Sequence, residues 1–148
     1  MGGICGFTAG RQGILPDRQK VLQAMAETIA HRGRGQKYFF ADDQLSSCFL
    51  PSNGGWESAN KQLPTDEKKR YRLVCDGTIF NHQQLRRELQ GQGHLFRTRQ
   101  DLEVIVHLYE ESGTACPGKL RGPFAFGLWD GKTKKLFLAR DRFGIRPL

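Results

Sequence analysis

The stretch from Leu73 to Asn81, L-V-C-D-G-T-I-F-N, constrains the fold of this chain more than any other. An apolar run ends in Asp76-Gly77 and restarts with the β-branched pair Thr78-Ile79. It then reaches Asn81, a residue type favoured at helix N-caps. The pattern predicts a strand, a glycine turn, a second short strand and a helix. This arrangement presents backbone N–H groups at the end of a sheet, where they can stabilise an oxyanion.

The rest of the chain predicts short strands and helices that occur in blocks, which is typical of α+β layers. The segment 51–65 is rich in Pro, Ser, Asn and Gly and is predicted to be a loop. The expected helices run from a cap at Asp17 to a C-cap at Gly33, over 83–89, and over 101–111, with Gly113 at the end. The expected strands are 3–7, 37–41, 45–50, 71–75, 124–130 and 136–139.

The length of 148 residues indicates one domain. No apolar run reaches the length of a membrane span and no signal-peptide pattern begins the chain, so we expect a cytoplasmic protein with no membrane partner. The four cysteines lie far apart with no C-x-x-C pair, which favours buried free thiols over disulfides or zinc. His82, His94 and His107 lack partners at metal-ligand spacing, so we interpret them as surface or packing residues and expect no metal site.

The net charge of +8 favours an acidic peptide or a nucleic acid as partner. The basic residues are scattered, however, over turns and polar helix faces such as 68–70, 86–87 and 132–135. No interleaving of aromatic and basic residues like an RNA-recognition signature is present. We therefore interpret the charge as a solvated surface and expect no nucleic-acid partner.

Five motifs resemble, in order and spacing, the glutaminase domain of asparagine synthetases, which are class II glutamine amidotransferases. The segment 76–81 resembles the family motif N-G-E-I-Y-N, and 98–105 resembles T-x-S-D-x-E-V-I. The start 1–7 resembles M-C-G-I-x-G-F, and His31-Arg32-Gly33 resembles the beginning of H-R-G-P-D, with Arg34 and Gly35 in place of Pro-Asp. The fifth motif has two parts, 120–130 and 140–148, which resemble L-x-G-x-F-A-F-A-L-W-D and R-D-R-x-G-x-x-P-L. The resemblance spans essentially the whole chain.

The resemblance implies a four-layer α-β-β-α sandwich of the N-terminal-nucleophile hydrolase type, in which two mainly antiparallel sheets face each other. The family domain continues for several strands beyond its P-L motif, and a synthetase domain with an S-G-G-x-D-S motif follows it. We therefore expect 1–148 to be an amidotransferase type 2-like domain that is truncated at its C-terminus. No cofactor is expected in this chain, because ATP and magnesium would belong to the missing synthetase domain, its expected partner.

The resemblance also implies which positions would carry glutamine hydrolysis. In the family an N-terminal Cys is the nucleophile and its own α-amine is the base. An Asn and a Gly form the oxyanion hole, and an Arg and an Asp hold the substrate. Here Gly2 stands at the nucleophile position and Asp76 at the Asn position. The Arg position falls near Pro51, and no R-L-S-I motif occurs within 45–63.

Part of the implied site is retained. Gly77 keeps the second oxyanion-hole position, and Asp101 keeps a substrate-binding position. Thr78 occupies a further substrate-binding position, where the motif has Glu. The other motif residues are expected to be structural; they are His31, Arg32, Gly33, Asn81, Arg140 and Asp141.

Cys5 is an alternative nucleophile. If residues 1–4 were removed, Cys5-Gly6-Phe7 would match the C-G-I start of some relatives that carry a leader. Ungapped matching instead places Cys5 in a variable apolar position, which favours a buried structural thiol.

These features predict a glutaminase-like domain of an ATP-dependent amide ligase, without glutaminase activity. Loss of a nucleophile costs on the order of 10⁶ in rate, and loss of one oxyanion donor costs about 10²–10³. The D-G-x-I-x-N form resembles β-lactam synthetases and lasso-peptide cyclases, relatives that need no ammonia. Two alternatives stay open. One is an active glutaminase that supplies ammonia for asparagine synthesis through Cys5, and the other is a non-catalytic module that binds an acidic peptide.

Overall fold

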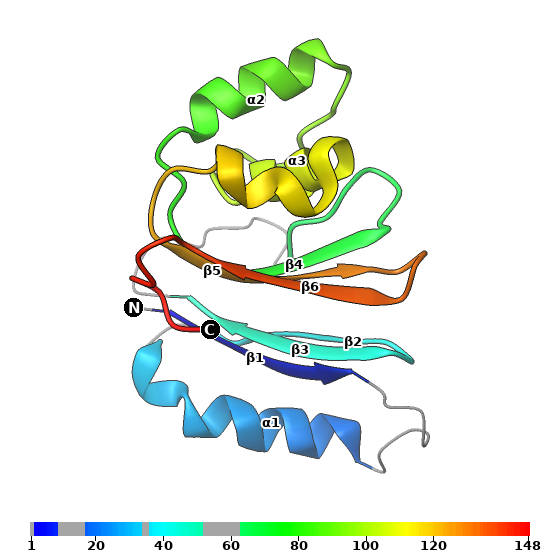
Figure 1. The fold of residues 1–148 in the computed structure, drawn as a ribbon. Coiled ribbons are helices and arrows are strands. Elements are labelled where there is room, and N and C mark those ends of the chain that lie inside the picture. The colour runs from blue at the N-terminus through cyan, green and yellow to red at the C-terminus, as the bar shows by residue number, and fades with distance from the viewer. Residues whose placement is uncertain (1, 9–16, 34–35, 52–62) are drawn as a thin grey trace. The chain divides into compact units, whose positions relative to one another are not determined.

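The computed structural model describes residues 2–8, 17–33, 36–51 and 63–148. Contacts divide the chain into two compact units, Met1–Leu63 and Pro64–Leu148, each with its own sheet (Figure 1). Most of the predicted loop 51–65 lies outside the described residues, as do Arg34 and Gly35.

The first unit is a three-stranded antiparallel sheet with one helix against it. The strand order is β1-β3-β2, from β1 (Gly3–Thr8), β3 (Leu45–Leu50) and β2 (Tyr38–Ala41). The predicted hairpin of β2 and β3 is confirmed, and Asp42 Oδ1 accepts the N–H groups of Gln44 and Leu45 at its turn. These bonds hold the turn with a short polar side chain, as Asp commonly does.

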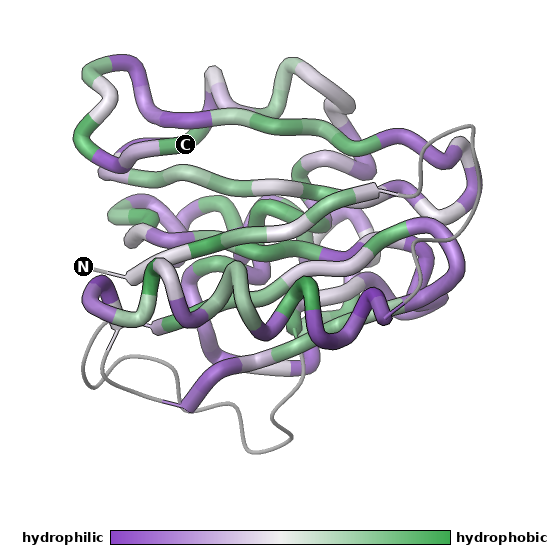
Figure 2. Tube along the Cα trace, turned by 90° about the horizontal axis from the view of Figure 1, so that it is seen from below, coloured by the Kyte–Doolittle hydropathy of each residue, from purple (hydrophilic) through white to green (hydrophobic). Residues whose placement is uncertain are grey.

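The helix α1 (Arg18–Thr28) contacts β1 and β3. Figure 2 shows polar and apolar residues alternating around its turns, and Leu22 and Ala26 are the buried ones. They pack with Cys48 and Leu50 of β3, so the apolar stripe that predicted the helix also forms the core of this unit. Asp17 lies at the N-cap with φ 60°, but its side chain makes no cap bond.

The end of this helix differs from the prediction. The α-helix stops at Thr28, and the 3₁₀ helix η1 (Ala30–Arg32) continues the chain. Gly33 caps η1 in an extended conformation rather than a left-handed one. A Cβ atom there would lie 2.8 Å from Pro51 O and 2.9 Å from Leu50 Cβ. Close approach of the backbone therefore explains this glycine.

The second unit also contains a three-stranded antiparallel sheet, in the order β4-β5-β6. Its strands are β4 (Tyr71–Gly77), β5 (Phe124–Asp130) and β6 (Lys135–Arg140), and the predicted hairpin of β5 and β6 is confirmed. The helix α3 (Glu103–Ser112) contacts β4, and α2 (His82–Gly91) contacts α3. As predicted, Gly113 ends α3, with φ 54°, and it opens the 3₁₀ helix η2 (Gly113–Lys119).

The predicted glycine turn after Asp76 is wrong. Strand β4 runs through Gly77, which pairs with Phe124 of β5. The pairing continues beyond the strand, because Thr78 N–H donates to Pro123 O at 2.9 Å and Phe80 N–H to Arg121 O at 2.7 Å. A Cβ on Gly77 would lie 2.4 Å from Pro123 O, so the neighbouring strand, and not a turn, requires glycine here.

Asn81 precedes α2 as predicted, but its side chain does not cap the helix. Its amide donates to Lys119 O and accepts from Arg121 N, both at 3.0 Å. The residue therefore ties the start of α2 to the segment before β5.

Two antiparallel sheets with helices agree with the α+β expectation, while the facing arrangement of a four-layer sandwich stays a prediction. All four cysteines are free thiols; Cys48, Cys75 and Cys116 are buried and Cys5 is half-buried. Among the described residues, no helix is both long enough and apolar enough to cross a membrane.

Candidate functional site

The implied oxyanion-hole segment, residues 76–81, begins at the end of β4 and continues beyond it. Two other parts of the second unit form hydrogen bonds with this segment. The first is residues 121–124, whose backbone pairs with it. The second is Asp101, whose Oδ2 accepts the N–H of Ile79 at 2.7 Å. This bond links the segment that contains Asp76, Gly77 and Thr78 to Asp101, just before α3.

Asp76 is buried at the end of β4, with 4% of its surface exposed. Its Oδ2 lies 3.7 Å from Nη1 of Arg146, whose side chain is 18% exposed. A carboxylate only accepts hydrogen bonds, whereas the amide of an Asn could donate one. The side chain at this position is therefore paired with a cation and offers no donor to a developing oxyanion.

Arg146 reaches Asp76 from a loop that is built around Asp141. This carboxylate is buried, and it accepts four backbone N–H groups, from Phe124, Phe143, Ile145 and Arg146, at 3.0–3.3 Å. Burial opposes the charge, but the four N–H groups outweigh it and hold the pKa of Asp141 below its ordinary value. These bonds fix the path of the loop that follows β6.

Gly144 completes the same loop with φ 62°. A Cβ at this position would lie 1.9 Å from Nη2 of Arg140, so the guanidinium of Arg140 packs closely over the glycine backbone. Arg140 thus packs within this loop, whereas the ion pair of Asp76 is with Arg146.

Cys75, next to Asp76, is not a candidate nucleophile. Burial first, and then the negative charges of Asp101 and Asp76, raise the pKa of its thiol well above the ordinary value. A buried protonated thiol is unreactive. The two carboxylates that raise it are those of the implied site.

The first unit holds the two candidate nucleophile positions. Gly2 is buried, and its carbonyl accepts the Nε–H of Arg32 at 3.0 Å, while His31 is exposed. Cys5 lies within β1, directly opposite Cys48. The hydrogen bond from the Cys48 thiol lowers the pKa of Cys5; partial burial opposes this, and Lys37 adds to it. Cys5 is thus less buried and more acidic than the sequence predicts.

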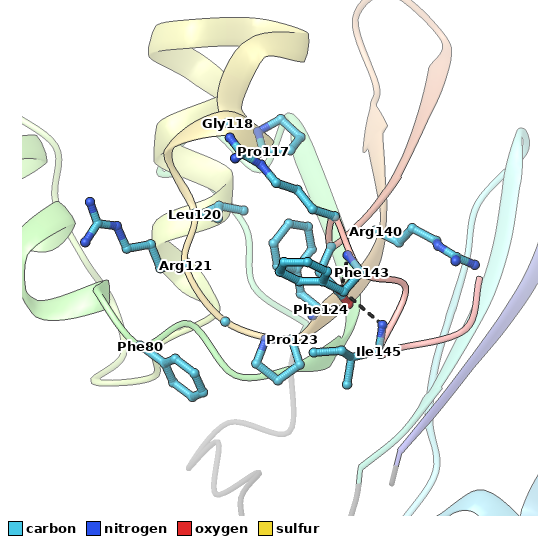
Figure 3. A pocket seen from close by; sticks show the side chains of 13 residues that line it. Phe80, Pro117, Gly118, Leu120, Arg121, Pro123, Phe124, Arg140, Phe143 and Ile145 are labelled. Atoms are coloured by element: carbon cyan, nitrogen blue, oxygen red, sulfur yellow. Dashed lines mark hydrogen bonds between the residues drawn. The ribbon is translucent and has the colours of Figure 1, made fainter.

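A pocket of about 600 Å³ lies beside the Asp141 loop in the second unit. Its wall is apolar, with Pro123, Phe124, Phe143 and Ile145 gathered together in Figure 3. Three arginines also line it: Arg121, Arg140 and Arg142. The pocket therefore combines apolar surface with positive charge.

Two features of the second unit were missed by sequence reasoning. Arg146 is the partner of Asp76, but 70 residues separate them in the sequence. His94 and His107 were expected to be surface or packing residues because they lack partners at metal-ligand spacing, yet their Nδ1 atoms lie 3.2 Å apart and Glu67 lies beside them. The available signal was His107 itself, a polar residue in the apolar run V-I-V-H-L of α3.

The family comparison matches the whole chain. A model described as a glutamine amidotransferase domain covers residues 1–148. The chain is similar to the glutamine-hydrolysing asparagine synthetase 2 of Bacillus subtilis, with 36% identity over 129 residues, which are 86% of this chain and 17% of that protein. It is 34% identical over 131 residues to asparagine synthetase B of Escherichia coli, covering 88% of this chain and 23% of the relative. The corresponding protein of Sandersonia aurantiaca is 43% identical over 140 residues, 88% of this chain and 24% of the relative.

A solved structure supports the same fold. The glutamine phosphoribosylpyrophosphate amidotransferase of Bacillus subtilis, complexed with ADP and GMP, matches with a TM-score of 0.56 and 25% identity. The match covers 71% of this chain and 24% of the other. The chain thus spans less than a quarter of that structure and about a fifth of the synthetases it resembles.

Proposed function

Because the chain belongs to the glutamine amidotransferase domain family, we propose that it is the N-terminal domain of an asparagine-synthetase-like, ATP-dependent amide ligase, and that its own glutaminase site is inactive. The named activity of its relatives supports the ligase. A synthetase domain would be its partner and would hold ATP and magnesium. The proposed location is the cytoplasm.

The ion pair of Asp76 with Arg146 carries the proposal of inactivity. Attack on a glutamine amide places negative charge on the amide oxygen, and catalysis needs hydrogen-bond donors aimed at that oxygen. A buried carboxylate beside it would repel the charge instead. Loss of one such donor costs about 10²–10³ in rate.

Gly2 adds a larger loss, because it has no nucleophilic side chain where the family has cysteine. Removing the nucleophile of a coupled catalytic unit costs on the order of 10⁶ in rate. Since both losses fall on the same reaction, restoring cysteine at position 2 by Gly2→Cys is not expected to rescue turnover.

The finer proposal concerns the ligase subtype. The D-G-T-I-F-N segment resembles β-lactam synthetases and lasso-peptide cyclases, in which the amine already belongs to the substrate. Such a ligase joins an adenylated carboxylate to that amine and has no use for ammonia. An inactive glutaminase site would then cost the parent protein nothing.

An active glutaminase that uses Cys5 is the second candidate. The lowered pKa of Cys5 favours it, because the thiolate is the nucleophilic form. Exposing Cys5 as the N-terminus, however, requires removal of Gly3 and Ile4. These residues pair with Leu50 and Phe49 in the sheet. Cleavage before Cys5 would therefore remove these two residue pairs from the edge strand β1.

A third candidate is a module that binds an acidic peptide, and the pocket beside the Asp141 loop favours it. Arg121, Arg140 and Arg142 supply positive charge around an apolar wall. Fluorescence anisotropy of a labelled peptide rich in Glu and Phe would measure binding of such a peptide to the protein. The module predicts saturable binding that Arg121→Gln and Arg142→Gln weaken, whereas an unchanged anisotropy contradicts it.

Glutamate release from glutamine tests the main proposal. We expect the protein and its Cys5→Ser variant to give the same background rate, and calorimetry to show no glutamine binding at millimolar concentration. The Cys116→Ser variant serves as a control for general thiol loss. Steady glutamate production that disappears only in Cys5→Ser would refute the proposal and establish the second candidate.

A further inference from the structure

Two histidines and a glutamate meet on the second unit, away from Asp76. Glu67 belongs to the turn before β4, His94 follows α2, and His107 lies in α3. His107 is completely buried, the side chain of His94 is 9% exposed and that of Glu67 is 31% exposed. One ligand atom from each lies within 4.8 Å of the other two. This group is called the Glu67–His94–His107 cluster.

The local structure aims these side chains at each other. Gly93, with φ 99°, follows the C-cap of α2 and places His94, whose N–H donates to Leu89 O at 3.1 Å. Glu67 Oε1 accepts the N–H of Leu95 at 2.7 Å. Phe96 packs against the His107 ring with 4.4 Å between centroids. The cluster is therefore held by backbone bonds and packing, not by surface side chains alone.

The outer nitrogens of both rings face carboxylates. His94 Nε2 lies 2.9 Å from Glu111 Oε1, and His107 Nε2 lies 3.8 Å from Glu103 Oε1. The carboxylate at 2.9 Å favours the His94 tautomer with the proton on Nε2, whereas the buried His107 Nε2 has no hydrogen-bond partner among the described residues. His94 Nδ1 is then an acceptor that faces His107 Nδ1 at 3.2 Å, with Glu67 Oε1 4.0 Å from His107 Nδ1. Either a proton on His107 Nδ1 or a metal ion between the rings satisfies these groups.

The spacing fits a metal ion. Two nitrogens bound to one zinc ion at about 2.0–2.1 Å, with a tetrahedral angle between them, lie about 3.3 Å apart. Imidazole and carboxylate are ligands for zinc and its first-row neighbours. Ligating histidines also commonly donate their other N–H to a carboxylate, as His94 is arranged to do toward Glu111.

We propose that Glu67, His94 and His107 bind one divalent transition-metal ion of the zinc class. Glu110 Oε2, 3.6 Å from His94 Nδ1, offers a fourth ligand. Arg97 also lies beside the cluster, and its guanidinium donates to the backbone oxygen of Glu67. The ion joins the turn before β4, the segment after α2 and the helix α3. It therefore stabilises the second unit, independently of glutamine chemistry.

The test is a titration of Zn²⁺ and Co²⁺ into the chelator-treated protein, followed by calorimetry and by the visible spectrum of Co²⁺. We expect one ion per chain and a rise of several degrees in Tm. Glu67→Gln and His94→Gln should each weaken binding at least tenfold. Glu111→Gln, which acts through His94, should weaken it by about 10–100-fold. Because His107 is buried, the two partly exposed ligands are substituted in its place.

The chain offers matched controls. His31→Gln and His82→Gln each remove one of the other two histidines and should leave the affinity unchanged. Cys5→Ser should also leave it unchanged, which separates the cluster from thiol binding. Equal binding by the protein and His94→Gln overturns the proposal. Failure to bind either ion, with a shared proton between the two rings in nitrogen-edited NMR spectra, overturns it as well.

Discussion

Asp76 and Asp141 are both buried carboxylates of the second unit, but their surroundings differ in kind. Asp141 accepts four backbone N–H groups, so it defines the path of the loop from residue 141 to residue 146. Asp76 faces the guanidinium of Arg146, a side chain, at 3.7 Å. Asp141 therefore stabilises the backbone of its loop, whereas Asp76 interacts with the side chain of Arg146.

This difference shows why the two positions should respond differently to substitution. Backbone donors cannot rearrange without moving the chain, whereas a guanidinium that is 18% exposed can turn toward water. Substitution of residue 76 should therefore cost less stability than substitution of residue 141. Phe124 connects the surroundings of Asp76 with those of Asp141, because it pairs with Gly77 and also exchanges hydrogen bonds with Asp141.

The largest expected effect comes from Gly77→Val, which disturbs both regions at Phe124. Its Cβ would lie 2.4 Å from Pro123 O and 2.7 Å from Phe124 Cα, so backbone must move. We expect a loss of about 3 kcal/mol in the free energy of unfolding, measured with urea. Gly91→Ala is the matched control, since a Cβ there meets nothing within 4 Å, and it should change stability by less than about 1 kcal/mol. Equal effects of the two would contradict the close packing of Gly77.

Asp141→Ala is expected to cost about 2–3 kcal/mol, because it leaves four backbone N–H groups without their acceptor. Urea unfolding measures the loss. Proteolysis should also cut first within residues 141–146. A loss below about 0.5 kcal/mol would show that this loop does not depend on the carboxylate.

Acidification should remove the contribution of Asp141 to the free energy of unfolding. Its pKa is lower in the folded protein than in the unfolded chain, so its contribution is present above about pH 3.9 and fades as the pH falls through the folded pKa. The stability difference between the protein and Asp141→Asn should therefore shrink with acidification. Urea unfolding at a series of pH values below 5 checks this, and a difference that grows toward low pH would have the wrong sign.

The smallest effect on stability is expected for Asp76→Asn. It weakens an ion pair with a partly exposed arginine while keeping the shape of the side chain, so we expect a change below about 1 kcal/mol. The new amide can donate a hydrogen bond, so glutamine binding should rise in calorimetry, without turnover. A destabilisation as large as that of Asp141→Ala would erase the distinction between the two carboxylates.

Sequence reasoning located the elements whose signals are local. The hairpins β2–β3 and β5–β6 and the end of α3 at Gly113 follow from alternation and turn residues near in the chain. The prediction of a turn at Gly77 was wrong, because the sequence does not distinguish a glycine required by a neighbouring strand from one required by a turn. Only the pairing with Phe124 distinguishes them.

The motifs indicated which site residues to consider, but not the contacts that these residues make. Asp76, Gly77 and Asp101 came from motif order, and the structure brings them together through Ile79. Arg146 and the histidine cluster depend on contacts across long stretches of chain, which no local pattern encodes. The single local hint was the position of His107 within the apolar run of α3, where the residue is buried.

The central claim is that this chain has no nucleophile for glutamine. Incubation with a diazo-ketone analogue of glutamine, which alkylates glutaminase nucleophiles, followed by intact mass spectrometry, tests it most directly. We expect an unmodified protein whose N-terminus is Met1 or Gly2. A species that lacks Met1 through Ile4 and carries one analogue on Cys5 would contradict it.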